Sequence, residues 1–343
     1  MSRTELSSRE IVKRCIEFRD PPRIAMDFVT IPVNGRRWQF SDFACVGYGV
    51  DPGFKPAMPG QTEWGFVLDS PDPTGENMGE PRHNPLAEGW GMLDTYRFPD
   101  FDNPIRYAGV ADRIAAARAA GKYIYAPITG LVYLPQALRG MENWLTDVAL
   151  EQENLGRLLD RLLEINLKLI DVFHSLGADG VITWDDMGIN DRAFVSPAMF
   201  KELFVPRYRR QIDALHDRGM HLLHHCCGRV CEYMDIFVEN HWDVLQLDQP
   251  CLMGIDYLGD NYGGKICFWN PVDIQKTMPT GDAGAIADEA HHQIWAMGRH
   301  NGGFMVKAYQ QPNAIGLTTA ALEAQYQAFM KYGNYPLEPY HAK

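Results

Sequence analysis

One pattern recurs along the chain: a short apolar run rich in β-branched residues, followed by a polar stretch with helical spacing. Strands that alternate with helices predict a parallel sheet, because each helix returns the chain to the same end of the sheet. Eight such units predict an α/β fold, a single-domain (β/α)8 TIM barrel, whose usual size is a little below 343 residues. The predicted strands are Arg23–Phe28, Phe43–Val50, Tyr123–Ile128, Gly180–Trp184, Met220–Cys226, Asp243–Leu247, Lys265–Trp269 and Gly303–Lys307.

Three segments between these runs have clear helical periodicity. In Asn154–Leu176 the leucines recur with a period near 3.6 residues, which is typical of a helix with one buried face. Pro197–Arg218 begins with a start signal, Ser196 as the N-cap and Pro197 at the first helical position. Asp282–His300 is the third predicted helix.

The segment Asp51–Ala119 is unusually rich in Gly, Pro and aromatic residues. We interpret residues 1–343 as one domain and residues 51–119 as an excursion that covers the barrel mouth.

The net charge of −12 argues against partners that are themselves strongly acidic. Nucleic acid and anionic membranes would both be repelled. We find no apolar run long enough to span a membrane and no signal peptide. Seven cysteines, three of them within six positions, do not resemble a disulfide framework. A cytoplasmic protein is the expectation.

Function in such a barrel gathers where the strands end and the loops begin. The polar and aromatic residues at these predicted ends include Trp184, Asp185, Asp186, His224, His225, Cys226, Cys227, Gln246, Asp248, Trp269, Lys307, Tyr309 and Gln310.

The fifth strand ends in a dense group of soft side chains, His224-His225-Cys226-Cys227-Gly228. Side chains two residues apart on a strand point the same way, so His225 and Cys227 form one pair. An imidazole and a thiolate in this arrangement suit zinc better than magnesium or calcium. The residues alone leave three interpretations open: a metal site, a Cys-His nucleophile pair, or a buried structural cluster.

Several segments together resemble the uroporphyrinogen decarboxylase superfamily, and within it the branch of cobalamin-dependent methyltransferases. They are the opening SSREIVKRCIEFRDPPRIAMDF, then TEWGFVLDSPD, then the long stretch from GVITWDDMG to LLHHCCG, and finally ICFWNPVDIQKTMPTG. The long stretch carries a strand ending in Asp-Asp, a Ser-Pro helix start and a strand ending in His-x-Cys-Gly.

The resemblance implies a methyltransferase whose His-x-Cys pair, His225 and Cys227, binds Zn²⁺. It also implies a cobalamin carried by a separate corrinoid protein, and a small organic methyl donor or acceptor as the other partner. Methyl transfer and O-demethylation are both represented in that branch.

The sequence departs from the resembled pattern in two places. Gln310 lies where the zinc enzymes of the branch place a third ligand, so we consider Asp185, Asp186, Glu63 and Cys226 as substitutes. The Arg-Gln-Ala-Gly-Arg-like segment of the true decarboxylases has no counterpart in IAMDFVTIPVNGRRW, which argues against a porphyrinogen substrate.

We therefore assign predicted roles to the strand-end residues. The predicted catalytic residues are Asp185, Asp186 and Asp248; the predicted substrate-binding residues are Trp184, Trp269, Tyr309, Lys307 and Gln310. Two alternatives remain. One is a metal-independent decarboxylase or lyase that binds a carboxylate through Lys307 or Arg192, and the other is a non-catalytic barrel that binds a small molecule.

Overall fold

The structure is a computed structural model that describes residues 6–28, 40–69 and 79–342. Its central sheet has eight strands, all paired in parallel, in the order β1-β10-β9-β8-β7-β6-β5-β2. The strands are β1 Ala25–Asp27, β2 Phe43–Cys45, β5 Tyr123–Pro127, β6 Gly180–Trp184, β7 His221–Cys226, β8 Val244–Leu247, β9 Cys267–Asn270 and β10 Phe304–Lys307. All eight predicted strands are present, and the predicted (β/α)8 barrel is confirmed.

A few backbone hydrogen bonds, rather than a regular ladder, close the gap between β1 and β2. Asp27 forms an antiparallel bridge with Ser41, and the Asp42 backbone N–H donates to the Met26 carbonyl at 2.8 Å. β2 is shorter than predicted, because the chain leaves the sheet after Val46 has donated to the Tyr125 carbonyl. The barrel is therefore nearly closed, and its strand ends share one mouth.

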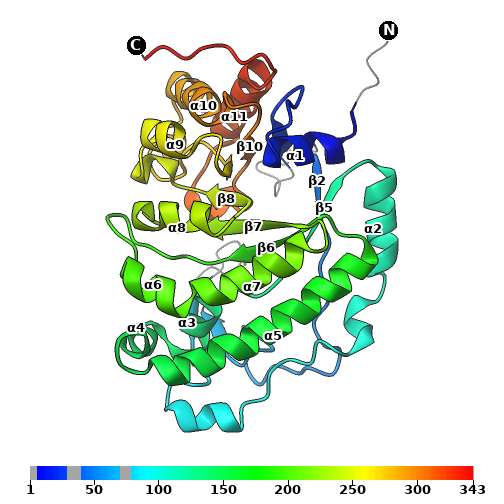
Figure 1. Ribbon diagram of the computed structural model, residues 1–343, viewed down its shortest axis with the longest axis vertical. Helices are drawn as coiled ribbons and strands as arrows, with labels where there is room; N and C mark the ends of the chain where they lie inside the picture. Colours follow the sequence, from blue (N-terminus) through cyan, green and yellow to red (C-terminus); the bar gives the residue numbers. More distant parts are fainter. Residues whose placement is uncertain (1–5, 29–39, 70–78, 343) are drawn as a thin grey trace.

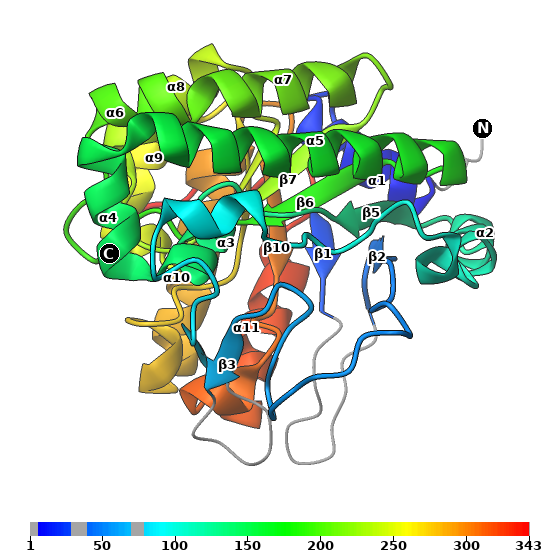
Figure 2. The ribbon, with the colours of Figure 1, turned by 90° about the horizontal axis from the view of Figure 1, so that it is seen from below.

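Helices cover the outside of the barrel, and α5 and α7 run side by side past β6 and β7 (Figures 1 and 2). The helices are α1 Ser8–Ile16, α2 Val110–Ala119, α3 Tyr133–Arg139, α4 Met141–Leu150, α5 Gln152–Leu176, α6 Pro197–Leu203, α7 Val205–His216, α8 Met234–Glu239, α9 Ile255–Tyr262, α10 Ala283–Gly298 and α11 Thr319–Tyr332.

The predicted single helix Pro197–Arg218 is wrong in its continuity. Ser196 does cap the start, where its hydroxyl accepts from the Met199 N–H at 3.3 Å. The segment then divides into α6 and α7 at Phe204, and Pro206 stands in the first turn of α7. Proline has no N–H to bond to the preceding turn, so a new helix begins there more readily than the old one continues.

The predicted excursion has two parts. Within the described residues 51–69 and 79–109 lie the hairpin of β3 Val67–Asp69 and β4 Glu80–Arg82 and two short 3-10 turns. This part contacts α3, the helix after the C-terminal end of β5: the Asn84 side chain donates to the Ala137 carbonyl and the Leu86 N–H to that of Leu138. The last ten residues form α2, which packs on β5 and α5 as an ordinary outer helix.

Two apolar cores lie on either side of the sheet. Alternate residues such as Ile182, Leu223 and Met305 pack inside the barrel, where α1 contributes Val12 and Cys15. Their neighbours, such as Leu222 and Val306, pack outward against the helices. The alternation of β-strands thus decides which polar residues at the strand ends face the lumen.

Candidate active site

β7 brings the predicted pair into the lumen. Leu223 belongs to the inner core and Leu222 to the outer one, so His225 and Cys227 continue the inner row. His225 is the register partner of Trp184 at the end of β6. The side chains of this row face the barrel mouth.

His224 belongs to the outer row. It is fully buried among rings of the outer helices, with centroid distances of 5.5 Å to Tyr208 and 6.2 Å to Trp242. Its Nδ1 lies 3.0 Å from the Thr183 hydroxyl, and burial among these rings, followed by the nearby His225, lowers its pKa to about 3. His224 is therefore a neutral core residue.

Asp186, His225 and Cys227 converge at the mouth. Their ligand atoms all lie within 4.8 Å of one another. His225 Nε2 is 3.4 Å from an Asp186 carboxylate oxygen and 3.5 Å from Cys227 Sγ, and the Cys227 backbone N–H donates to the same carboxylate at 3.0 Å. The Asp186 side chain is 48% exposed and that of His225 12%, so the group is open on the Asp186 side.

This donor set fits a zinc ion. Catalytic zinc sites use three protein ligands drawn from imidazole, thiolate and carboxylate, and keep a fourth position open. A zinc-bound histidine normally donates its second ring N–H to another group, which fixes the ring. His225 meets this condition, because its Nδ1 lies 2.5 Å from the Gln246 carbonyl oxygen.

The charges of the cluster also favour a cation. Burial alone would lower the pKa of His225, but Cys227, Asp186 and Asp248 outweigh it and hold that pKa well above the usual value. Burial raises the pKa of Cys227, with a smaller opposing effect from His225. For Asp186 the effect of burial is outweighed by His225 and the Cys227 N–H, so its pKa is lowered. Without a metal, the imidazolium is the cation that balances Asp186.

A second polar layer lies beneath His225. Gln246 and Asp248 extend from β8, and Lys307 extends from β10. Lys307 Nζ is 3.0 Å from the Gln246 carbonyl oxygen and 3.3 Å from Asp248, while the Gln246 amide N–H donates to Asp248 at 2.6 Å. Burial would raise the pKa of Asp248, but Lys307 and then His225 hold it below the usual range.

Asp185 does not join this group. It is fully buried and accepts from the backbone N–H groups of Leu131, Val132 and Tyr133 at 3.1, 2.8 and 2.8 Å, and from the Tyr208 hydroxyl at 2.5 Å. Burial outweighs these bonds and raises its pKa to about 6. Asp185 ties the loop before α3 to the end of β6, and its predicted catalytic role gains no support from this position.

The predicted substrate-binding residues lie in different surroundings. Trp184 is 41% exposed on the lumen side of the mouth. Tyr309 is half-buried close to the cluster: burial and then the neighbouring Asp248 and Cys227 raise its pKa to about 12. Trp269 lies in the inner core, where it stacks on Phe43 with ring centroids 4.9 Å apart. Gln310 is exposed.

Two other substitutes for a third ligand are engaged elsewhere. Glu63 forms an ion pair with the buried Arg106. Cys226 is buried in the outer core. The residue that sequence reasoning left without a role is Gln246, which the period-two spacing before Asp248 places in the lumen.

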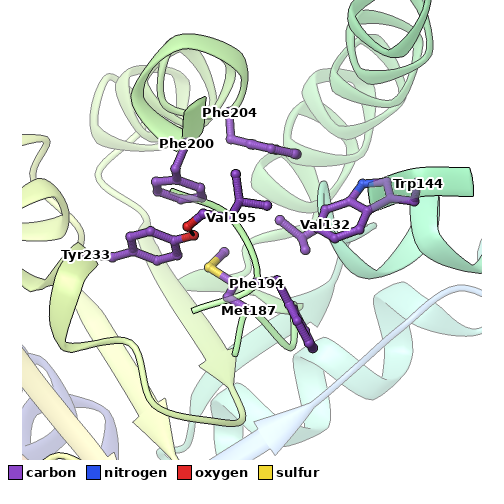
Figure 3. A pocket seen from close by; sticks show the side chains of 8 residues that line it. All are labelled: Val132, Trp144, Met187, Phe194, Val195, Phe200, Phe204 and Tyr233. Carbon is purple, nitrogen blue, oxygen red and sulfur yellow. Dashed lines mark hydrogen bonds between the residues drawn. The ribbon is translucent and has the colours of Figure 1, made fainter. Parts of the chain in front are cut away.

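The loop after Asp186 is held by an apolar cluster rather than by a second polar site. A cavity of about 10 Å³ lies among Val132, Trp144, Met187, Phe194, Val195, Phe200, Phe204 and Tyr233 (Figure 3). The Tyr233 hydroxyl donates to the Val195 carbonyl there. The space is no larger than about one water-sized sphere, so it belongs to core packing.

The part of the chain that contains this site resembles a known family. Residues 110–268, from α2 to β9, match the family model described as uroporphyrinogen decarboxylase (URO-D). The barrel is uroporphyrinogen decarboxylase-like. The resemblance to the uroporphyrinogen decarboxylase superfamily inferred from the motifs is confirmed over these residues, which include Asp186, His225 and Cys227.

Solved structures agree on the fold. A methyltransferase from Methanosarcina mazei is similar with a TM-score of 0.68 and 13% identity, over 96% of this chain and 99% of that one. A chitinase from Chromobacterium violaceum, at 13% identity and a TM-score of 0.39, covers 64% of this chain and 83% of its own, too weakly to carry an inference. No curated protein matches the sequence. None of the described helices combines the length and apolar character needed to cross a membrane.

Proposed function

We propose that the protein is a methyltransferase that moves a methyl group between a small organic substrate and a corrinoid carried by a separate protein. The observation that carries the proposal is the convergence of Asp186, His225 and Cys227 at an open barrel mouth. The uroporphyrinogen decarboxylase-like family match supports it, and the shared fold with a methyltransferase is consistent with it.

In this proposal Asp186, His225 and Cys227 would hold a zinc ion, which would lower the pKa of a thiol, water or alcohol bound beside it. The chain itself positions the substrate and excludes water from the reacting atoms. Trp184, exposed on the same face, offers an aromatic wall for the substrate. With a thiol as acceptor, its sulfur would take the methyl group, the corrinoid would be the leaving group and keep the electron pair of the broken bond, and the thiol proton would leave to solvent.

The metal-independent lyase lacks a supporting cation in the described residues considered for it. Lys307 is paired with Asp248 at 3.3 Å, and Arg192 is exposed and paired with Asp191 at 3.4 Å. A carboxylate substrate would have to compete with these partners. We therefore propose the methyltransferase alone.

The test is metal analysis of protein purified without chelator, combined with methyl transfer between methylcobalamin and a thiol. We expect stoichiometric zinc, and we expect Cys227→Ala to lose both zinc and transfer while its melting temperature stays within a few degrees. Cys226→Ala is the matched control, because Cys226 lies next in sequence but faces the outer core. Full transfer by zinc-free wild type, or by Cys227→Ala, would exclude the zinc site from the reaction, and zinc-loaded wild type that transfers no methyl group would exclude the methyltransferase.

A further inference from the structure

We infer that Gln246, held by Lys307 and Asp248, is a positioning residue that fixes the tautomer and orientation of His225. The inference rests on the proposed function, in that the fixed ring serves the metal. It assigns Lys307 and Asp248 a role different from substrate binding and proton transfer.

The Gln246 amide has only one favourable orientation. Its carbonyl oxygen lies 3.0 Å from the Lys307 ammonium, and its NH₂ group 2.6 Å from an Asp248 carboxylate oxygen. Rotation of the amide by a half turn would set its NH₂ against an ammonium, which can only donate, and its carbonyl against a carboxylate, which can only accept. The ion pair therefore keeps the side-chain carbonyl oxygen of Gln246 directed at Lys307 and His225.

The carbonyl oxygen in turn decides where His225 carries its proton. It lies 2.5 Å from His225 Nδ1, and a carbonyl oxygen cannot donate, so Nδ1 must carry a hydrogen. A neutral His225 ring then has its lone pair on Nε2. That atom is the one 3.4 Å from Asp186 and 3.5 Å from Cys227 Sγ.

All three side chains of this arrangement are buried, which restricts their movement. Lys307 is 8% exposed, Asp248 2% and Gln246 1%. A charge pair at such depth is costly to desolvate and adds little net stability, so its value lies in the orientation it imposes. Partners of this kind, which contact a ligand rather than the metal, typically change metal affinity by about 10–100-fold when removed.

The first measurement is the Zn²⁺ dissociation constant by chelator competition. Gln246→Leu removes the acceptor and is expected to weaken zinc binding by about 10–100-fold. An exchange variant, Gln246→Glu with Asp248→Asn, keeps an acceptor for Nδ1–H and a donor facing an acceptor between positions 246 and 248, so it should stay within about threefold of wild type. Lys307→Met with Asp248→Asn removes the ion pair without leaving a lone buried charge. We expect this double variant to weaken binding by about tenfold.

The matched control is Thr183→Val, which removes a hydrogen-bond partner 3.0 Å from the buried His224 on the outer face. Zinc affinity should not change there. Melting temperatures identify a variant that has simply lost its fold. Recovery of zinc affinity in the exchange variant Gln246→Glu/Asp248→Asn, compared with Gln246→Leu, then shows that the acceptor for Nδ1–H is what matters.

A second measurement does not depend on metal. In protein labelled with ¹⁵N-histidine, His225 should give a downfield, slowly exchanging Nδ1–H signal that disappears in Gln246→Leu and persists in Thr183→Val. Wild type that keeps this signal but binds no zinc would defeat the proposed function and leave the positioning role standing. Wild-type zinc affinity in both Gln246→Leu and Lys307→Met/Asp248→Asn, or absence of the Nδ1–H signal from folded wild type, would overturn the positioning role.

Discussion

Substitution of Asp185 can test whether burial or hydrogen bonding decides the protonation state of its carboxyl group. Asp185→Asn keeps the shape and one oxygen, but places an NH₂ group where the Leu131 N–H and the Tyr208 hydroxyl now donate. The Leu131 N–H would then lack an acceptor. A buried unsatisfied donor costs about 1–3 kcal/mol, so the substitution should lower the free energy of unfolding by about that amount when wild-type Asp185 is ionised.

The cost should grow as the pH falls. Burial raises the pKa of Asp185 to about 6, from 3.8 in the unfolded chain. Between these values the folded state holds the proton more often, so the Asp185 contribution to stability is larger at low pH and is lost as pH rises through the folded pKa. From about pH 8 to about pH 5 wild type should gain roughly 1.4 kcal/mol that Asp185→Asn cannot gain.

The assay is urea unfolding of both proteins at the two pH values, with the difference taken at each pH so that all other titrations cancel. Thr183→Val is the control, because it also removes a buried side-chain hydrogen bond but touches His224, whose pKa of about 3 keeps it neutral at both pH values. A cost of Asp185→Asn that is equal at both pH values would refute the reasoning. The four hydrogen bonds would then outweigh burial and keep the carboxylate ionised.

Three further outcomes are expected at the mouth. Gly228 has φ +87°, and a Cβ there would lie 2.1 Å from the Gly188 carbonyl oxygen. Gly228→Ala should therefore lower the free energy of unfolding by about 2 kcal/mol or more and weaken zinc binding measured by chelator competition. Wild-type zinc affinity in this variant would contradict the prediction. Trp184→Ala should raise the KM for the organic substrate about tenfold at an unchanged melting temperature, and an unchanged KM would remove Trp184 from the site. Zinc must displace the protons whose pKa is raised on His225 and Cys227, so its affinity should fall by about 10–100-fold per pH unit as the pH falls below those raised pKa values. A flat profile in the same competition assay would show that these residues are not the ligands.

The barrel was predictable because its strands are buried on both faces. An apolar run such as Tyr123–Pro127 contrasts with its surroundings, and its period of two also orders the residues of β7 into an inner and an outer row. The distinction between His224 and His225 therefore followed from local sequence. So did the Ser196 cap, which depends on residues three positions apart.

Features that depend on contacts across the barrel were not predictable in this way. Asp185 and Asp186 are adjacent and chemically identical, yet one bonds to a loop more than fifty residues away and the other to β7. Trp269 stands at a strand end like Trp184, but Phe43 from the opposite part of the chain covers it. The helix break at Phe204 had a local signal in Pro206, which the start signal at Ser196 obscured.

In the proposed site, a third ligand taken from another strand end would let the barrel keep its chemistry although its sequence departs from the resembled pattern. That pattern expects a ligand near Gln310, beyond β10, but Gln310 is exposed and the lumen side of β10 presents Lys307 instead. Within the described residues, Asp186 from β6 approaches His225 and Cys227 from the other side. A carboxylate is a harder and weaker donor to zinc than a thiolate, so an ion held here would keep more of its positive charge for the group in its open position. In the proposed site, the move of one ligand from β10 to β6 therefore strengthens activation of the nucleophile, and it leaves β10 free to provide the lysine that orients Gln246.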